Sequence, residues 1–215
     1  MIKGLILGAV IVLLLLGGYL AFFNKDDSVI GHTVSLIPKG GTDSSDSSTT
    51  PSLSSLTPEQ TQTAYHGLIV HILDLREVVG KDILKQVELV NIINQDIKQI
   101  GSDNIQEQWE TTALCLARTC TDKDFMQLIL TVAIEGDRDG YEVGNLIMNI
   151  LTANKYWGSD NTIRFSESLD KANKQITSLN KPAVSGSWKK LVACDGQCAE
   201  KNSLTFDAIR QIVNN

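Results

Sequence analysis

The feature that most constrains this chain is an apolar run near its amino terminus, from Gly4 to Phe23, which follows a single positive charge at Lys3. A helix needs about 20 apolar residues to cross the hydrocarbon core of a bilayer, and residues 5–23 reach that length without a charged side chain. A secretory signal peptide would have a shorter apolar core and an Ala-x-Ala cleavage site, and the sequence around Phe23 has no such site. The run therefore predicts an uncleaved single-pass anchor, with a cleaved signal peptide as the alternative.

The residues on either side of the run predict its orientation. Lys3 precedes the run, whereas residues 24–27 carry a net negative charge. Because positively charged flanks tend to stay in the cytoplasm, we expect a cytoplasmic amino terminus and an exported carboxy-terminal part. The predicted location is the cell membrane, which the chain spans once from Leu5 to Phe23, with an extracytoplasmic domain.

A low-complexity segment follows the apolar run. The stretch 40–52 consists almost entirely of glycine, serine, threonine and aspartate. Such a segment buries too little apolar surface to offset its ordering entropy, which predicts a disordered Ser/Thr-rich linker. A bare tether and an O-glycosylated stalk both fit this composition. We therefore divide the chain into an anchor at 1–23, a linker at 24–57 and an extracytoplasmic helical domain at 58–215.

From Thr57 onward the pattern is that of amphipathic helices. Thr57 as N-cap, Pro58 at the first helical position and Gln60 at the capping-box position form a helix start signal. Apolar residues then recur at helical spacing almost to the end of the chain, with hardly any period-two alternation. The fold class predicted is all-α, a multi-helix bundle of about six to eight helices. We find no internal repeat of solenoid length, which is about 20–50 residues.

The pattern also predicts a buried face, an N-cap and a helix end. The apolar stripe places Ile83 and Val87 on the buried face of the helix that follows Asp82. Asp139 is the expected N-cap of the helix that contains Leu146. Pro182 is expected to end the helix that precedes it.

The four cysteines form two local pairs, Cys115 with Cys120 and Cys194 with Cys198. Exported thiols are usually oxidised, and each pair lies where a predicted helix ends. We therefore favour the disulfides Cys115–Cys120 and Cys194–Cys198, although the sequence allows other connectivities. A zinc or iron–sulfur site made of four thiolates is the alternative, with spacings looser than the usual Cys-x-x-Cys.

An acidic turn carries a weak calcium signal. Glu135, Asp137 and Asp139 precede Gly140 at the spacing of the first ligands of an EF-hand loop. The match then fails, because Leu146 occupies the position where a bidentate glutamate is needed. We therefore favour no metal site and expect no cofactor.

Signals for catalysis and for nucleic-acid binding are missing from the sequence. His66 and His71 lie five positions apart, which puts them on different faces of one helix, and no serine stands in a Gly-x-Ser-x-Gly motif. A net charge of −6 argues against nucleic acid as a partner. Trp157 at a helix end is the candidate contact for a partner, although a tryptophan is more often a core anchor.

The leading interpretation is a membrane-anchored surface protein whose helical domain is a binding or structural module, with another protein or a surface component as its partner. An envelope hydrolase and a metal-binding module are the alternatives. Because no catalytic motif stands in the chain, the sequence favours a module that is not an enzyme.

Overall fold

The computed structural model describes residues 57–116, 119–194 and 198–214. The predicted anchor at 1–23, and all of the predicted linker at 24–57 except Thr57, lie outside the described residues and stay predictions. None of the described helices is long and apolar enough to cross a membrane.

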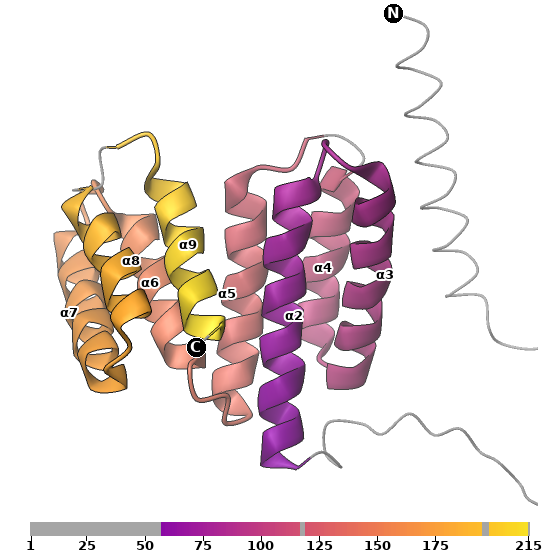
Figure 1. Cartoon of the computed structure of the whole chain (residues 1–215), viewed down its shortest axis with the longest axis horizontal. Helices are drawn as coiled ribbons and strands as arrows, with labels where there is room; N and C mark the ends of the chain where they lie inside the picture. Colours follow the sequence, from indigo (N-terminus) through magenta and orange to yellow (C-terminus); the bar gives the residue numbers. More distant parts are fainter. Residues whose placement is uncertain (1–56, 117–118, 195–197, 215) are drawn as a thin grey trace, which may run out of the picture. The chain divides into compact units, whose positions relative to one another are not determined.

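The described residues form eight α-helices and no strands, which confirms the all-α class. Successive helices run in opposite directions, as expected for helices joined by short turns (Figure 1). Their bounds are α2 Pro58–Val78, α3 Ile83–Ile100, α4 Asp103–Leu116, α5 Asp122–Arg138, α6 Gly144–Tyr156, α7 Thr162–Leu179, α8 Pro182–Ala193 and α9 Lys201–Val213.

Local capping explains where several of these helices begin and end. The Thr57 N–H donates to Oε1 of Gln60 at 2.8 Å, and the Gln60 N–H donates to the Thr57 hydroxyl at 3.3 Å, which confirms the predicted capping box. Asp82 caps α3 through the Lys85 N–H at 3.0 Å. Gly101 ends α3 at φ 72°, a conformation that glycine adopts at little cost.

Two local predictions were wrong. Ile83 and Val87 are 43% and 42% exposed, and the buried residues of α3 begin only at Leu89. Asp139 does not cap α6, which begins at Gly144; it follows the last residue of α5 instead. As predicted, the helix before Pro182 ends ahead of it, at Leu179, and Pro182 also starts α8 at a position where its missing N–H costs nothing.

The eight helices form two halves with the same arrangement. In the first half, residues 58–138, α2 packs against α3 and α5, and α4 packs against α5. In the second half, residues 144–213, α6 packs against α7 and α9, and α8 packs against α9. The halves meet where α5 contacts α6 and α2 contacts α9, and one buried cluster runs through both. The domain is therefore a pair of four-helix units around a continuous core.

The turns repeat together with the helices. α2 and α6 end on C-caps of the same conformation, Val79 at φ −54° and ψ 124° and Trp157 at φ −64° and ψ 118°. A glycine with positive φ follows each of them, Gly80 at 72° and Gly158 at 75°. Both turns thus begin with the same backbone conformation, although the turn after α6 is one residue longer.

An asparagine–tryptophan hydrogen bond also repeats. The indole N–H of Trp109 donates to Oδ1 of Asn94 at 2.7 Å, and that of Trp188 donates to Oδ1 of Asn173 at 2.6 Å, each over 15 residues. Trp188 lies 79 positions after Trp109, and Asn173 lies 79 positions after Asn94. The same offset relates Leu84 to Ile163, Gly101 to Asn180, Ser102 to Lys181, Ile105 to Val184 and Cys115 to Cys194.

Burial in the last helix of each half follows the repeat with an offset of 80 positions. The buried pairs are Phe125 and Thr205, Leu128 and Ala208, Ile129 and Ile209, Val132 and Ile212, and Ala133 and Val213. Residues related in these ways are called equivalent below. The repeat is longer than a solenoid period and few equivalent residues are identical, so the sequence did not reveal it.

Candidate functional site

The structure brings each favoured cysteine pair to disulfide distance. The Cα atoms of Cys115 and Cys120 lie 4.9 Å apart, and those of Cys194 and Cys198 lie 5.5 Å apart. The pairs lie at the carboxy-terminal ends of α4 and α8, which are at the same end of the bundle, where α3 and α7 begin (Figure 1). We call this the disulfide end, and the opposite end, where α2 begins at Pro58, the linker end. Among the described residues no group of three or more His, Cys, Asp or Glu side chains could hold a metal ion.

The carboxylates of the acidic turn have different surroundings. Glu135 belongs to α5, where its carboxylate accepts from Arg138 at 2.6 Å and from the side-chain amide of Asn104 at 3.0 Å. Asp139 accepts from the hydroxyl of Tyr65 on α2. Because these two carboxylates contact separate partners, the structure does not bring the residues with calcium-ligand spacing together at one site. The contact with Tyr65 was not predictable, since the residues lie 74 positions apart.

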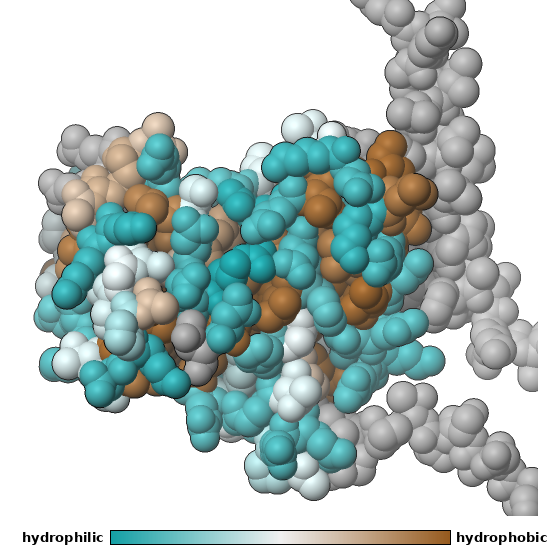
Figure 2. All heavy atoms as spheres, in the orientation of Figure 1, coloured by the Kyte–Doolittle hydropathy of each residue, from teal (hydrophilic) through white to brown (hydrophobic). Residues whose placement is uncertain are grey.

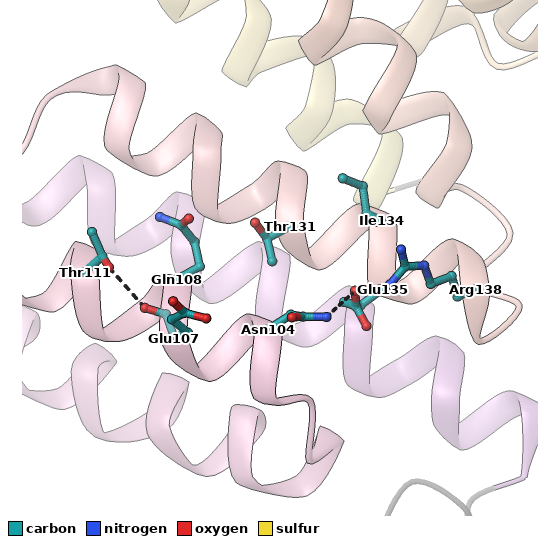
Figure 3. Close-up of a pocket in the computed structure, with 8 residues that line it drawn as sticks. All are labelled: Asn104, Glu107, Gln108, Thr111, Thr131, Ile134, Glu135 and Arg138. Atoms are coloured by element: carbon teal, nitrogen blue, oxygen red, sulfur yellow. Dashed lines mark hydrogen bonds and ion pairs between the residues drawn. The ribbon is translucent and has the colours of Figure 1, made fainter.

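A polar cavity of about 370 Å³ lies between α4 and α5, where Glu135 and Arg138 meet (Figure 3). Two of its hydroxyls, those of Thr111 and Thr131, donate to backbone carbonyls of their own helices. Its lining is Asn104, Glu107, Gln108, Thr111, Thr131, Ile134, Glu135 and Arg138. The polar side chains of Asn104, Thr111, Thr131, Glu135 and Arg138 are thus engaged with one another or with their own helices.

The aromatic candidate for a partner contact is buried. Trp157 is 8% exposed, and its ring lies 5.1 Å from that of Phe165. It therefore anchors the turn between α6 and α7 instead of presenting an aromatic face.

The two histidines of α2 have different surroundings. Nδ1 of His71 lies 2.6 Å from the carboxylate of Asp96 on α3. Burial raises the pKa of Asp96, and the contact with His71 partly opposes that shift. His66 lines a cavity at the linker end. The structure thus brings the histidines to no common site.

That second cavity lies where the two halves meet, and we call it the seam cavity. It has a volume of about 540 Å³. Its lining is Gln62, Thr63 and His66 of α2, Tyr141, Glu142 and Val143 of the turn before α6, Leu179 at the end of α7, Lys181 and Val184 at the start of α8, and Ile212 and Val213 at the end of α9.

Tyr141 is the unusual residue of the seam cavity. Its side chain is buried, and its hydroxyl has no hydrogen-bond partner in the part of the chain that the structure describes. Burial raises the pKa of Tyr141 well above its usual value, so the phenol stays protonated. The turn itself is held by Gln62, whose side chain donates to the Gly140 carbonyl and accepts from the Glu142 N–H.

Exposed apolar side chains mark the disulfide end. Figure 2 shows an apolar patch over the upper end of α3, where Ile83, Leu84 and Val87 lie. Leu84 is 85% exposed, and its equivalent in α7, Ile163, is 71% exposed. Leu114, in the last turn of α4, is also exposed and lies toward the same end. Periodicity predicted part of this patch to be core, so the sequence missed it.

No family model, curated protein or solved structure matches this chain.

Proposed function

We propose that this chain is a single-pass membrane-anchored surface protein whose exported helical domain binds another protein. In this proposal residues 5–23 form the anchor, residues 24–57 carry the domain outward, and the exposed apolar side chains of the disulfide end form the binding surface. The observation that carries the proposal is the exposure of Leu84 and Ile163 at equivalent positions.

Leu84 and Ile163 differ from ordinary exposed apolar residues because they occupy equivalent positions in the two halves. A single exposed apolar side chain is common and needs no functional reason. Leu84 and Ile163 each stand second in an equivalent helix, and both are mostly in water, where they add little to the stability of the fold. Burying each against a partner would contribute about 1.5–3 kcal/mol.

The surroundings of Leu84 favour a protein as the partner. The ion pair between Lys85 and Glu88, at 3.0 Å, and the capping carboxylate of Asp82 flank the apolar side chain. An apolar centre with a rim of both charges is the arrangement found in protein–protein interfaces.

Export predicts that both cysteine pairs are oxidised. We expect the intact mass of the purified protein to lie four hydrogen atoms below that of the fully reduced chain, because four thiols form two bonds. Mass spectrometry with and without reduction and alkylation measures this difference. Four free thiols, or a native mass raised by zinc or iron, would contradict both the disulfides and the exported location.

Photocrosslinking tests the binding surface directly. We place a photoreactive amino acid at Leu84 or at Ile163 of the full chain in its native membrane, with Lys98 and Lys174, exposed near the other ends of α3 and α7, as matched controls. The expected result is one discrete adduct of the same mass from both Leu84 and Ile163 and none from the lysines. Its partner, once purified, should bind a Leu84→Ser variant about tenfold more weakly. Equal labelling at all four positions would refute the proposal.

A further inference from the structure

The two halves of the domain differ in charge. Residues 57–143 contain 15 acidic and 7 basic side chains, whereas residues 144–215 contain 6 acidic and 9 basic ones. The difference is sharpest in the equivalent helices α4 and α8. α4 contains three acidic side chains and no basic one, whereas α8 contains Lys189 and Lys190 and no acidic one. Glu110 and Lys189 occupy equivalent positions, so the charge of this helix is reversed between the halves.

These two helices lie on opposite faces of the domain. α5 contacts α6 and α2 contacts α9, an exchange of equivalent helices that a two-fold axis between the halves produces. The axis is parallel to the helices, because α4 and α8 both end at the disulfide end. In Figure 1, α8 accordingly lies toward the viewer, whereas the fainter α4 lies away from the viewer. The domain thus has an acidic helix on one face and a basic, parallel helix on the other.

Each of the two helices has an exposed stripe at helical spacing. The stripe of α4 consists of Asn104, Glu107, Thr111 and Leu114, and the stripe of α8 consists of their equivalents Ala183, Gly186, Lys190 and Ala193. All of these residues are exposed. A Cβ atom at Gly186 would meet no atom within 4 Å. The α8 stripe is therefore made of small residues with one long side chain, that of Lys190.

The α4 stripe borders the polar cavity between α4 and α5. Asn104, Glu107 and Thr111 belong to the lining of that cavity (Figure 3). Arg138 on the opposite side pairs with Glu135 at 2.6 Å. Among the described residues, neither Glu107 nor Lys190 forms an ion pair. One face thus has a hollow with an unpaired carboxylate, and the other has a projecting, unpaired ammonium group.

We propose that the domain associates head to tail with a second copy of this chain, so that Lys190 of one copy enters the polar cavity of the next copy beside Glu107. Gly186 is the equivalent of Glu107 and lies four positions before Lys190. With α8 of one copy level with α4 of the next, the two charges are about 6 Å apart along the axis, which a lysine side chain spans.

This contact joins two different faces. A pair of copies therefore still has one free face of each kind, and the contact can extend into a row. Because α4 and α8 run in the same direction, every copy in the row has its linker end on the same side. That arrangement suits domains that are all anchored in one membrane. The contact does not involve Leu84 or Ile163 and does not depend on the partner proposed for them.

The test uses the full chain in its native membrane, with a photoreactive amino acid at Thr111. The expected product is an adduct of twice the chain mass, in which the crosslinked peptide of the second copy comes from α8. The same photoreactive amino acid at Lys98, exposed on α3, should give no such adduct. High salt should reduce the adduct, because exposed charges are screened. Gly186→Trp should abolish it, while the purified variant stays folded by circular dichroism.

Charge reversals distinguish the two faces. Glu107→Lys and Lys190→Glu should each reduce the adduct about tenfold, because an attraction between exposed charges becomes a repulsion of similar size. Lys171→Glu, an equal change on the exposed surface of α7, should leave it unchanged. Expressing the Glu107→Lys and Lys190→Glu chains together should restore the adduct, because Lys190 of the first variant can contact Glu107 of the second.

Failure of the mixed variants to restore the adduct would overturn the head-to-tail contact, as would an adduct that joins α4 to α4. If Thr111 gives no adduct of twice the chain mass, or gives one with another protein alone, self-association through these faces is wrong. Crosslinking from Leu84 and Ile163 is measured separately, so either result leaves the test of the protein-binding surface intact.

Discussion

Replacing Gly144 by alanine is expected to destabilise the domain by about 2–3 kcal/mol, as overpacking in a close contact does. A Cβ atom at Gly144 would lie 2.8 Å from the Ala133 carbonyl oxygen and 3.0 Å from the Asp137 backbone nitrogen. Both are backbone atoms of α5 and cannot rotate away, so α5 and α6 must move apart where the two halves join. Urea unfolding of the fragment 57–215, followed by circular dichroism, measures the decrease in the free energy of unfolding.

Gly186 provides the matched control for this substitution. It lies inside α8, and a Cβ atom there would meet no atom within 4 Å. Gly186→Ala should therefore stabilise the domain by about 0.5–1 kcal/mol, because alanine loses less backbone entropy than glycine in a helix. Unfolding of both glycine variants at the same urea concentration would contradict the close contact between α5 and α6 at Gly144.

Removal of the repeated tryptophans, Trp109 and Trp188, is expected to have the largest effect on the stability of the domain. Trp109→Ala and Trp188→Ala should each lower the free energy of unfolding by about 3–5 kcal/mol, because each empties a buried site of indole size. The two losses should be similar, since Trp109 and Trp188 occupy equivalent positions. The same urea titration measures both.

The asparagine partners separate the hydrogen bond from the packing. Asn94→Ala and Asn173→Ala keep the indole rings but leave their N–H groups without an acceptor, at a cost of about 1–3 kcal/mol each. A large effect in one half with none in the other would show that the two units are not stabilised alike. Equal effects in both would support the duplicated arrangement.

Local interactions are what the sequence predicted well. The Thr57 capping box joins residues three positions apart, and helical periodicity predicted an all-α domain. The favoured cysteine pairs were chosen because each is close along the chain, and both lie at disulfide distance. Signals of this range are complete within a few residues, so they can be read without knowing the tertiary arrangement.

The sequence by itself thus predicted the helical class, the start of α2, the end of α7 and two favoured cysteine pairs that lie at disulfide distance, and it predicts an anchor that lies outside the described residues. The tertiary structure decided what depends on distant neighbours. Val87 is exposed although it lies on the apolar stripe of α3, and Asp139 binds Tyr65 across 74 positions. α6 begins two turns later than α2 relative to its neighbours, a difference between the two halves that no local pattern records.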